Sequence, residues 1–169
     1  MKELKTFLIE KVLLFGSDTL LPETEKVLKQ VRREKPDSPV IYISSGTSSV
    51  IAGSESTYSA IEAYIGENSL SYSLIRVGCN GPANFEPLLC IHLPGKNKLF
   101  FRNITGEKVE PLLNGVLHND INEDDLAGQT GTRGFEYWPG IPFMDELPFF
   151  SRQKRVILAN QAPIGNTWI

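Results

Sequence analysis

The sequence predicts an α/β domain built on a mixed four-stranded sheet that is flanked by helices and followed by an extended C-terminal tail. A strand, a helix and a second strand follow one another within residues 40–77, an order that makes the two strands parallel. Residues 88–102 then show two apolar runs around a Pro-Gly turn, which is typical of an antiparallel hairpin. A helix with a clear apolar stripe follows the hairpin.

The elements before the hairpin are bounded by residues that start or stop secondary structure. A helix is expected over 22–35, because Pro22 suits a first helical position and two further prolines end the pattern. Residues 40–43 form a short β-branched run and predict a buried strand. A second helix is expected over 51–64, and the alternating run 71–77 predicts the second strand.

The hairpin and the last helix complete the domain. Strands are expected over 88–93 and 98–102, joined by the turn 94–97. Thr105 is placed to cap the helix that follows. Its apolar residues fall on one helical face: Val109, Leu112, Leu113, Val116 and Leu117. This order of elements is the thioredoxin-like arrangement, with helices on both faces of the sheet.

Composition divides the chain into four segments. Residues 1–37 are an N-terminal arm and helix, and 38–118 form the thioredoxin-like domain. Residues 119–147 are rich in acidic residues, glycine and proline and are expected to be a linker, held on a surface by its aromatic side chains. Residues 148–169 are expected to open a further domain that the sequence cuts short.

Charge and cysteine content exclude several classes of function. The chain has 169 residues and a net charge of -3, so it has no electrostatic reason to bind nucleic acid or anionic lipid. No apolar run is long enough to insert into a membrane. Two cysteines are too few for a secreted disulfide scaffold, which makes the cytoplasm the expected location.

Three stretches resemble a known family. Residues 44–49 read SSGTSS, where thioredoxin-like [2Fe–2S] ferredoxin modules have Cys-x-Gly-Thr-x-Cys. Residues 78–83 read GCNGPA, where the family has Gly-Cys-x-Gly-x-Cys. Residues 148–160 are similar to the segment that opens the flavin-binding domain in NADH-oxidising flavoprotein subunits. The chain therefore resembles the N-terminal module of the NADH-binding subunit of NADH:quinone oxidoreductase (complex I) or of an NAD-linked hydrogenase.

The resemblance implies a function for the parent protein. It would be an NADH dehydrogenase whose C-terminal part binds FMN, NAD and a [4Fe–4S] cluster and passes electrons onward. This segment would be a non-catalytic structural or interaction domain. Its partners would be other domains or subunits of the complex, and the complex could lie on the inner face of a membrane through partner subunits.

The family's cluster positions have lost most of their ligands. They correspond to Ser44, Ser49, Cys79 and Ala83. A [2Fe–2S] cluster needs four protein ligands, normally thiolates. A serine hydroxyl is protonated at neutral pH, and alanine offers no donor. We therefore expect these positions to be vestigial, with neither a cofactor nor a metal bound in this segment.

Two other readings of the loops remain open. The hydroxyl-rich loop Ser44–Ser49 precedes a helix, so it could bind an anion or a small ligand, although serine and glycine are also ordinary loop and cap residues. Cys79 could be a reactive thiol, but it has no second cysteine two or three residues away. A leftover structural cysteine is the simpler interpretation.

The remaining polar residues have ordinary explanations. Cys90 and His92 share one strand face, which is half of a metal pattern whose second half is absent. His118 lies near a helix C-terminus, where it complements the dipole. A basic start of the next domain accounts for Arg152, Lys154 and Arg155. No set of residues for acid–base catalysis is evident.

Overall fold

A computed structural model of the chain describes residues 6–7, 9–10, 22–31, 35–79, 81–132 and 134–153. The chain forms two compact units, residues 1–36 and 37–169. The first contains the helix α2 (Pro22–Val31), on which Thr24 and Leu28 are buried. Most of the N-terminal arm lies outside the described residues, and so does the expected continuation of this helix over 32–34.

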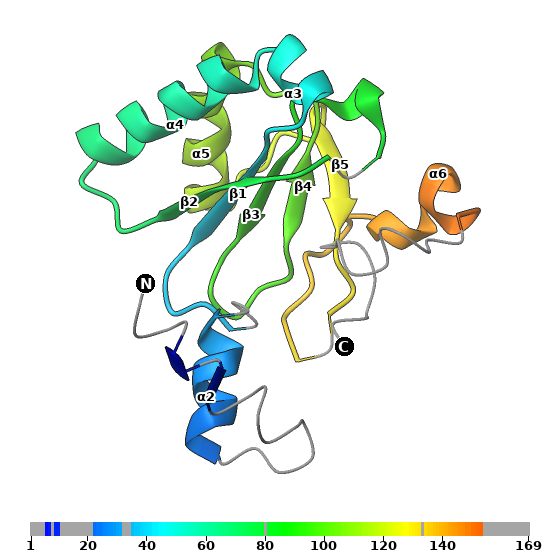
Figure 1. Cartoon of the computed structure of the whole chain (residues 1–169). Helices are drawn as coiled ribbons and strands as arrows, with labels where there is room; N and C mark the ends of the chain where they lie inside the picture. The colour runs from blue at the N-terminus through cyan, green and yellow to red at the C-terminus, as the bar shows by residue number, and fades with distance from the viewer. Residues whose placement is uncertain are drawn as a thin grey trace. The chain divides into compact units, whose positions relative to one another are not determined.

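The second unit is built on a five-stranded mixed sheet (Figure 1). Its strands are β1 (Val40–Ser44), β2 (Ser73–Val77), β3 (Leu89–His92), β4 (Leu99–Phe101) and β5 (Leu126–Gln129). They lie in the order β2-β1-β3-β4-β5. The first two strands are parallel, and all other neighbours are antiparallel. The unit therefore has the thioredoxin-like α/β fold that the sequence predicts, with one strand more than expected.

One face of the sheet is covered by two long helices, α4 (Ser54–Glu67) and α5 (Val109–His118), which contact each other. They bury the odd-numbered residues of the central strands, such as Ile41, Ile91 and Leu99. This packing follows from the alternation of strand side chains and the apolar stripe of each helix. It forms the larger of two apolar cores.

The opposite face is covered by a short stretch of the tail, which contains the turn η5 (Met144–Glu146) and the helix α6 (Pro148–Ser151). Met144 and Phe150 pack there against Cys90 and Phe100. Helical segments thus lie on both faces, but the two long helices share one of them.

The helix cap expected at Thr105 is not formed. Thr105 precedes the turn η4 (Gly106–Lys108), and its side chain makes no capping hydrogen bond.

Two stretches differ from their predicted secondary structure. The helix expected over 51–64 is α4 and begins at Ser54, whereas residues 47–49, expected to be loop, begin a separate short helix, α3 (Thr47–Ile51); Gly53 between the two helices adopts a left-handed backbone with φ 100°. Residues 119–147, assigned to a linker, contain the strand β5. Its composition gave no strand signal, since alanine and glycine are depleted in strands and pairing with β4 determines the structure.

The tail beyond β5 is anchored by Trp138, which is buried in the larger core. Its indole Nε1 donates to the carbonyl of Asn97 at 2.8 Å. The side chain of Gln129 accepts from the Trp138 backbone N–H and donates to its carbonyl, both at 2.8 Å. The aromatic residues of this segment therefore hold it on the domain surface. Within the described part of the chain, no helix combines the length and apolar character needed to cross a membrane.

Gly115 on α5 provides a test of this packing. A Cβ at this position would lie 2.5 Å from the carbonyl oxygen of Asp120, which is a backbone atom that cannot move aside cheaply. We expect G115A to lower the free energy of unfolding by roughly 1–3 kcal/mol, although a helical Gly-to-Ala change is ordinarily favourable. The matched control is G66A on α4, where no atom lies within 4 Å. Urea unfolding should show the control equal to wild type or more stable; equal losses in both variants would contradict the packing.

Candidate functional site

The vestigial cluster positions lie around the carboxyl ends of β1 and β2. Ser44 ends β1, and Cys79 follows β2 by two residues. The backbone N–H and the hydroxyl of Ser45 both donate to the carbonyl of Val77, at 2.8 and 3.0 Å. A Cβ on Gly46 would lie 3.2 Å from the Cβ of Cys79, so the two loops are in close contact. The structure thus brings the Ser44–Ser49 loop against the Cys79 loop.

Ser44 is fully buried and its hydroxyl is committed to a hydrogen bond within the protein. The Ser44 Oγ donates to the carboxylate of Glu86. The backbone N–H of Leu88 donates to both groups, at 2.9 Å to Ser44 Oγ and 3.0 Å to Glu86 Oε2. Ser44 also donates its backbone N–H to the Leu88 carbonyl at 3.0 Å. This group of contacts, which we call the Ser44–Glu86 clasp, joins the end of β1 to the loop that enters β3.

The loop that carries Glu86 is itself fixed to the residues after β4. The amide nitrogen of the Asn103 side chain, in the orientation that satisfies both of its polar atoms, donates to the carbonyls of Glu86 (3.2 Å) and Asn84 (3.0 Å). The backbone N–H of Ile104 donates to the carbonyl of Pro87 at 3.1 Å. These contacts hold Glu86 in place, and its side chain is only 6% exposed.

The other two vestigial positions differ in exposure. Ser49 lies on α3 and is fully buried, and its hydroxyl has no hydrogen-bond partner. Ala83 is exposed and opens the turn η3 (Ala83–Phe85). Cys79 is half-buried, and the backbone N–H of Gly81 donates to its sulfur at 3.3 Å. The positions therefore flank one end of the sheet, and only Cys79 among them presents a thiol.

The side chains present here do not fit a [2Fe–2S] cluster. Four thiolates are normally required, whereas these positions provide one thiol, two hydroxyls and a methyl group. One of the two hydroxyls already donates to a carboxylate. Among the described residues, no group of three or more histidine, cysteine or acidic side chains is arranged to hold a metal ion.

The anion-binding interpretation of the Ser44–Ser49 loop receives no support from the geometry. Ser44 and Ser45 use their hydroxyls in hydrogen bonds to other parts of the protein. The carboxylate of Glu86 adds negative charge beside Ser44. The helix α3, which begins within this stretch at Thr47, has only five residues, so its dipole is small. An anion placed beside Ser44 would meet repulsion from this carboxylate.

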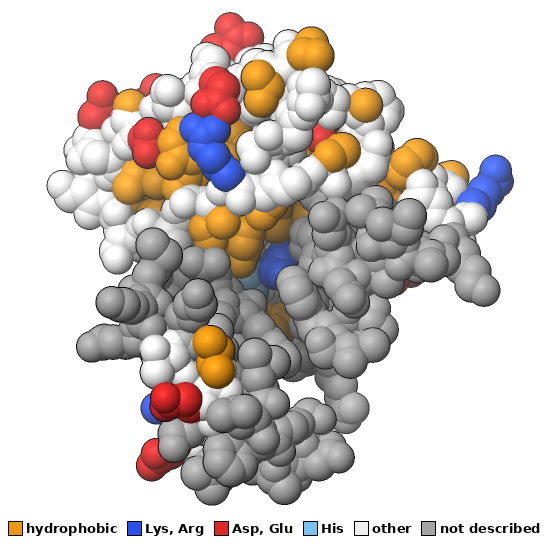
Figure 2. Space-filling model, viewed as in Figure 1, with side chains coloured by type: hydrophobic (Ala, Val, Ile, Leu, Met, Phe, Trp, Pro, Cys, Tyr) orange, Lys and Arg blue, Asp and Glu red, His pale blue; other side chains and the backbone are white. Residues whose placement is uncertain are grey.

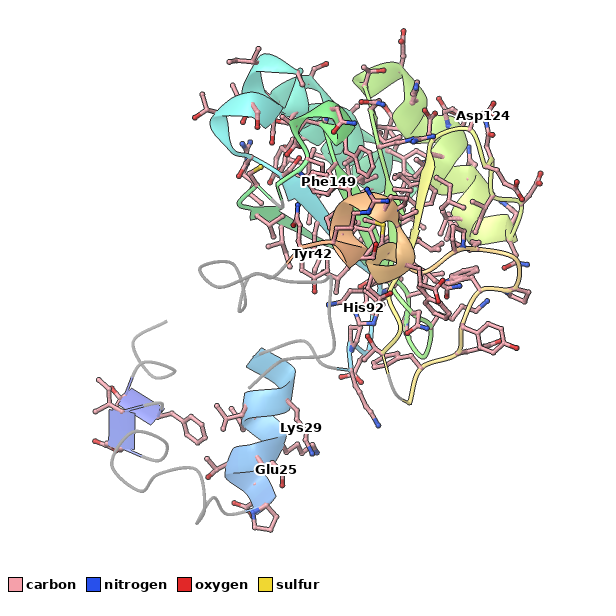
Figure 3. The ribbon with its side chains drawn as sticks, turned by 90° about the vertical axis from the view of Figure 1, so that its right-hand side faces the viewer. Glu25, Lys29, Tyr42, His92, Asp124 and Phe149 are labelled. Carbon is pink, nitrogen blue, oxygen red and sulfur yellow. The ribbon has the colours of Figure 1, made fainter. Side chains whose placement is uncertain are left out.

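Cys90, His92 and Lys98 lie near one another on the sheet face that α6 partly covers; Figure 3 labels His92 and the neighbouring Tyr42. Burial raises the pKa of the Cys90 thiol to about 12, so it stays protonated at neutral pH. Burial, with a smaller contribution from the charge of Lys98, lowers the pKa of His92 to about 4. His92 Nδ1 is buried without a hydrogen-bond partner, and its ring lies 5.2 Å from that of Phe135. Cys90 and His92 are therefore packed strand residues.

The remaining basic candidates play no part in the site. His118 ends α5 and its Nδ1 lies 2.8 Å from the carbonyl of Asn114, in keeping with a role at the helix C-terminus. Arg152 is exposed just after α6. Lys154 and Arg155 lie outside the described residues, as does most of the segment expected to open a further domain.

Apolar side chains are exposed next to the vestigial loops. Val50 and Ile51 on α3 are exposed, and Ile51 reaches 83%. Figure 2 shows separate apolar side chains on the upper surface of the domain, where Figure 1 places α3. The expected cost of exposing such residues is roughly 1.5–3 kcal/mol each relative to burial. Single exposed apolar side chains are ordinary on a protein surface, so Val50 and Ile51 mark a candidate docking position and not an extended apolar patch.

Comparison with known proteins gives similarity only at the level of structure. No protein-family model and no curated protein matches the sequence. A thioredoxin-like [2Fe–2S] ferredoxin from Aquifex aeolicus aligns at 12% identity with a TM-score of 0.48, over 60% of this chain and 100% of that one. Another structure, of the wild-type ferredoxin, aligns at 12% identity with a TM-score of 0.44, over 54% of this chain and 96% of that one. A cysteine-to-serine variant of this ferredoxin aligns at 13% identity with a TM-score of 0.45, over 52% of this chain and 95% of that one. Structural similarity at this level gives no information about cofactors or activity.

Sequence reasoning missed the residue that dominates the site, Glu86. Nothing in its neighbourhood singles it out, because it stands alone between a phenylalanine and a proline. The signal that could have found it is its position just before the strand that pairs with β1, which brings it to the end of β1 where Ser44 lies. A glutamate there is unusual, because acidic side chains are rarely buried unless they are paired or hydrogen-bonded.

Proposed function

We propose that residues 37–153 are an interaction module that keeps the thioredoxin-like fold without binding an iron–sulfur cluster. In this proposal the module is the N-terminal domain of the flavoprotein subunit of an NADH-oxidising enzyme, of the NADH:quinone oxidoreductase or NAD-linked hydrogenase type. The enzyme's chemistry takes place in the rest of the protein. The module contributes surfaces that pack against that rest or against a neighbouring subunit.

The observation that carries the proposal is the Ser44–Glu86 clasp. At the first vestigial position the side chain is buried, and it is hydrogen-bonded to a carboxylate instead of being available to a metal. Two apolar cores hold the sheet and helices together, so the fold does not need a cluster as a cross-link. A thioredoxin-like domain can therefore persist after its ligands are lost, and it can retain a role in assembly.

The parent protein's chemistry follows from the sequence resemblance. FMN, NAD and a [4Fe–4S] cluster would be bound by the C-terminal part of the parent protein, and electrons would pass from NADH through them without entering this module. The location would be cytoplasmic, with the complex held at the inner face of a membrane by partner subunits. The exposed residues Val50 and Ile51 are the surface we assign to docking.

The parent enzyme allows a direct test of a module that carries no electrons. C79S removes the last thiol at the vestigial positions. It should leave the rate of NADH oxidation with the enzyme's acceptor within about twofold of wild type, because no cluster depends on this sulfur. I51D should instead weaken association of the module with its partner by tenfold or more, since it places a charge in an apolar interface. The control is A63D at an exposed position of α4, which should bind normally.

The opposite outcomes are equally clear. A fall in electron transfer of a hundredfold or more in C79S, in a protein that is otherwise assembled, would mean that this thiol holds a redox centre. Equal binding by I51D and the A63D control would remove α3 as the docking surface. The full-length coding sequence provides an independent check: the proposal expects a glycine-rich nucleotide loop and a late cysteine cluster in it.

A further inference from the structure

We propose that Glu86 is a second barrier to cluster binding, independent of the missing cysteines, and that the Ser44–Glu86 clasp replaces a cluster as the cross-link between the end of β1 and the loop that enters β3. This inference rests on the proposed function, because it assumes that the natural chain binds no cluster. It predicts that restoring the thiols alone does not restore the site.

The position of Glu86 is the first step. Its carboxylate accepts a hydrogen bond from the side chain of residue 44, so it occupies the space next to the atom that a ligand at this position would present. The same carboxylate accepts the Leu88 N–H at 3.0 Å. Together these bonds connect the last residue of β1 with the residues just before β3. In a cluster-binding module, a ligand at position 44 would make a cross-link of this kind through metal.

The charge of Glu86 is the second step. A metal is bound by a thiolate and not by a thiol. A carboxylate within hydrogen-bond distance disfavours a second negative charge, so it raises the pKa of a cysteine placed at residue 44. A [2Fe–2S] cluster with four thiolates is itself negatively charged, and a buried carboxylate next to it is repelled with little screening. Glu86 therefore opposes both the formation of the ligand and the binding of the cluster.

Glu86 also has little freedom to move away. Its side chain is 6% exposed, and its backbone carbonyl accepts from the Asn103 side chain at 3.2 Å. Among the described residues, no lysine or arginine forms an ion pair with it. If the hydroxyl of Ser44 is lost, the buried carboxylate loses that donor and keeps the Leu88 N–H, which is a costly change. The clasp is therefore a cooperative feature of the folded domain.

The decisive experiment compares two variants of the chain after anaerobic incubation with iron and sulfide. The triple variant S44C/S49C/A83C restores all four thiols, together with Cys79. The quadruple variant adds E86Q, which keeps a hydrogen-bond acceptor at residue 86 but removes the charge. The matched control adds E62Q instead, at an exposed position of α4. Iron and acid-labile sulfide per chain, with the visible absorption of the cluster, are the readouts.

We expect less than about a tenth of a cluster per chain in the triple variant and in the E62Q control, and at least a fivefold higher occupancy in the quadruple variant. Stoichiometric cluster in the triple variant would overturn the inference, because the carboxylate would then be no barrier. Equal, negligible occupancy with and without E86Q would overturn it as well. Iron bound by the wild-type chain would refute the proposed function, which is a separate result.

The cross-link is tested without any metal, in variants that need only one or two changes. S44A, E86A and the double variant form a mutant cycle whose readout is the unfolding equilibrium constant in urea, because E86A, unlike E86Q, removes the acceptor of the Ser44 hydroxyl. Multiplying the fold-changes of the two single variants predicts the unfolding constant of the double variant if the residues act independently. If the clasp exists, the measured constant is lower than this prediction by roughly tenfold or more. Effects that multiply without coupling would contradict the clasp.

Discussion

F100A is expected to lower the free energy of unfolding by about 3–5 kcal/mol, the range for truncating a buried aromatic side chain. Phe100 is fully buried in β4, between Cys90 of β3 and Gly128 of β5. It packs in the smaller core, with Met144 and Phe150 from the tail. Because a domain of this size has a total stability of roughly 5–15 kcal/mol, the loss is a large part of it. Urea unfolding followed by the fluorescence of the buried Trp138 measures it.

The control for this substitution is F149A. Phe149 lies on α6 next to a core residue, but it is itself 44% exposed. Its truncation should cost under about 1 kcal/mol. If F100A and F149A were equally mild, the second face of the sheet would not be covered by the tail in solution. The comparison therefore tests the one part of the core that the sequence did not reveal.

Acidification is expected to destabilise the domain through His92. The side chain is 2% exposed, and burial lowers its pKa from 6.5 to about 4 in the folded state. Above pH 6.5, His92 is neutral in both the folded and the unfolded state. As the pH falls from about 6.5 to about 4, only the unfolded state takes up the proton, so the free energy of unfolding falls. The difference of about 2.5 pKa units corresponds to at most about 3 kcal/mol.

H92F isolates this contribution from the titration of the carboxylates. The variant retains a ring beside Phe135 and removes both ring nitrogens, of which Nδ1 has no hydrogen-bond partner. Stability measured between pH 7.5 and 4 should fall less in the variant than in wild type, by up to about 3 kcal/mol. Identical pH dependence in the two proteins would show that His92 is accessible to protons in the folded state.

The elements that the sequence predicted well are those in which the periodicity of apolar residues agrees with their packing in the structure. The strand at 40–43 and the helix after the hairpin carry strong local patterns, and both lie where expected, at β1 and α5. The strand β5 was missed because Ala127 and Gly128 favour no strand; their partner strand and the bulge at Phe100 and Phe101 specify it. Such a strand is set by tertiary contacts, which local sequence does not encode.

The candidate site shows a similar division. The loop positions Ser44 and Cys79 were found from spacing, and the structure places their loops in contact. The carboxylate that dominates their surroundings was not found, because Glu86 is 42 residues from Ser44 and only strand pairing brings the two together. The short helix α3 was missed for a local reason, since the threonine and serine residues at its start favour loops and caps.

The central claim is that this thioredoxin-like domain folds without a metal cluster. The most direct measurement is the iron and acid-labile sulfide content of the wild-type chain after expression and incubation with both components under anaerobic conditions. We predict a colourless protein with less than about a tenth of an iron atom per chain and with unfolding unchanged by a chelator. Two irons and two sulfides per chain, with loss of stability on chelation, would contradict the claim and return the domain to electron transfer.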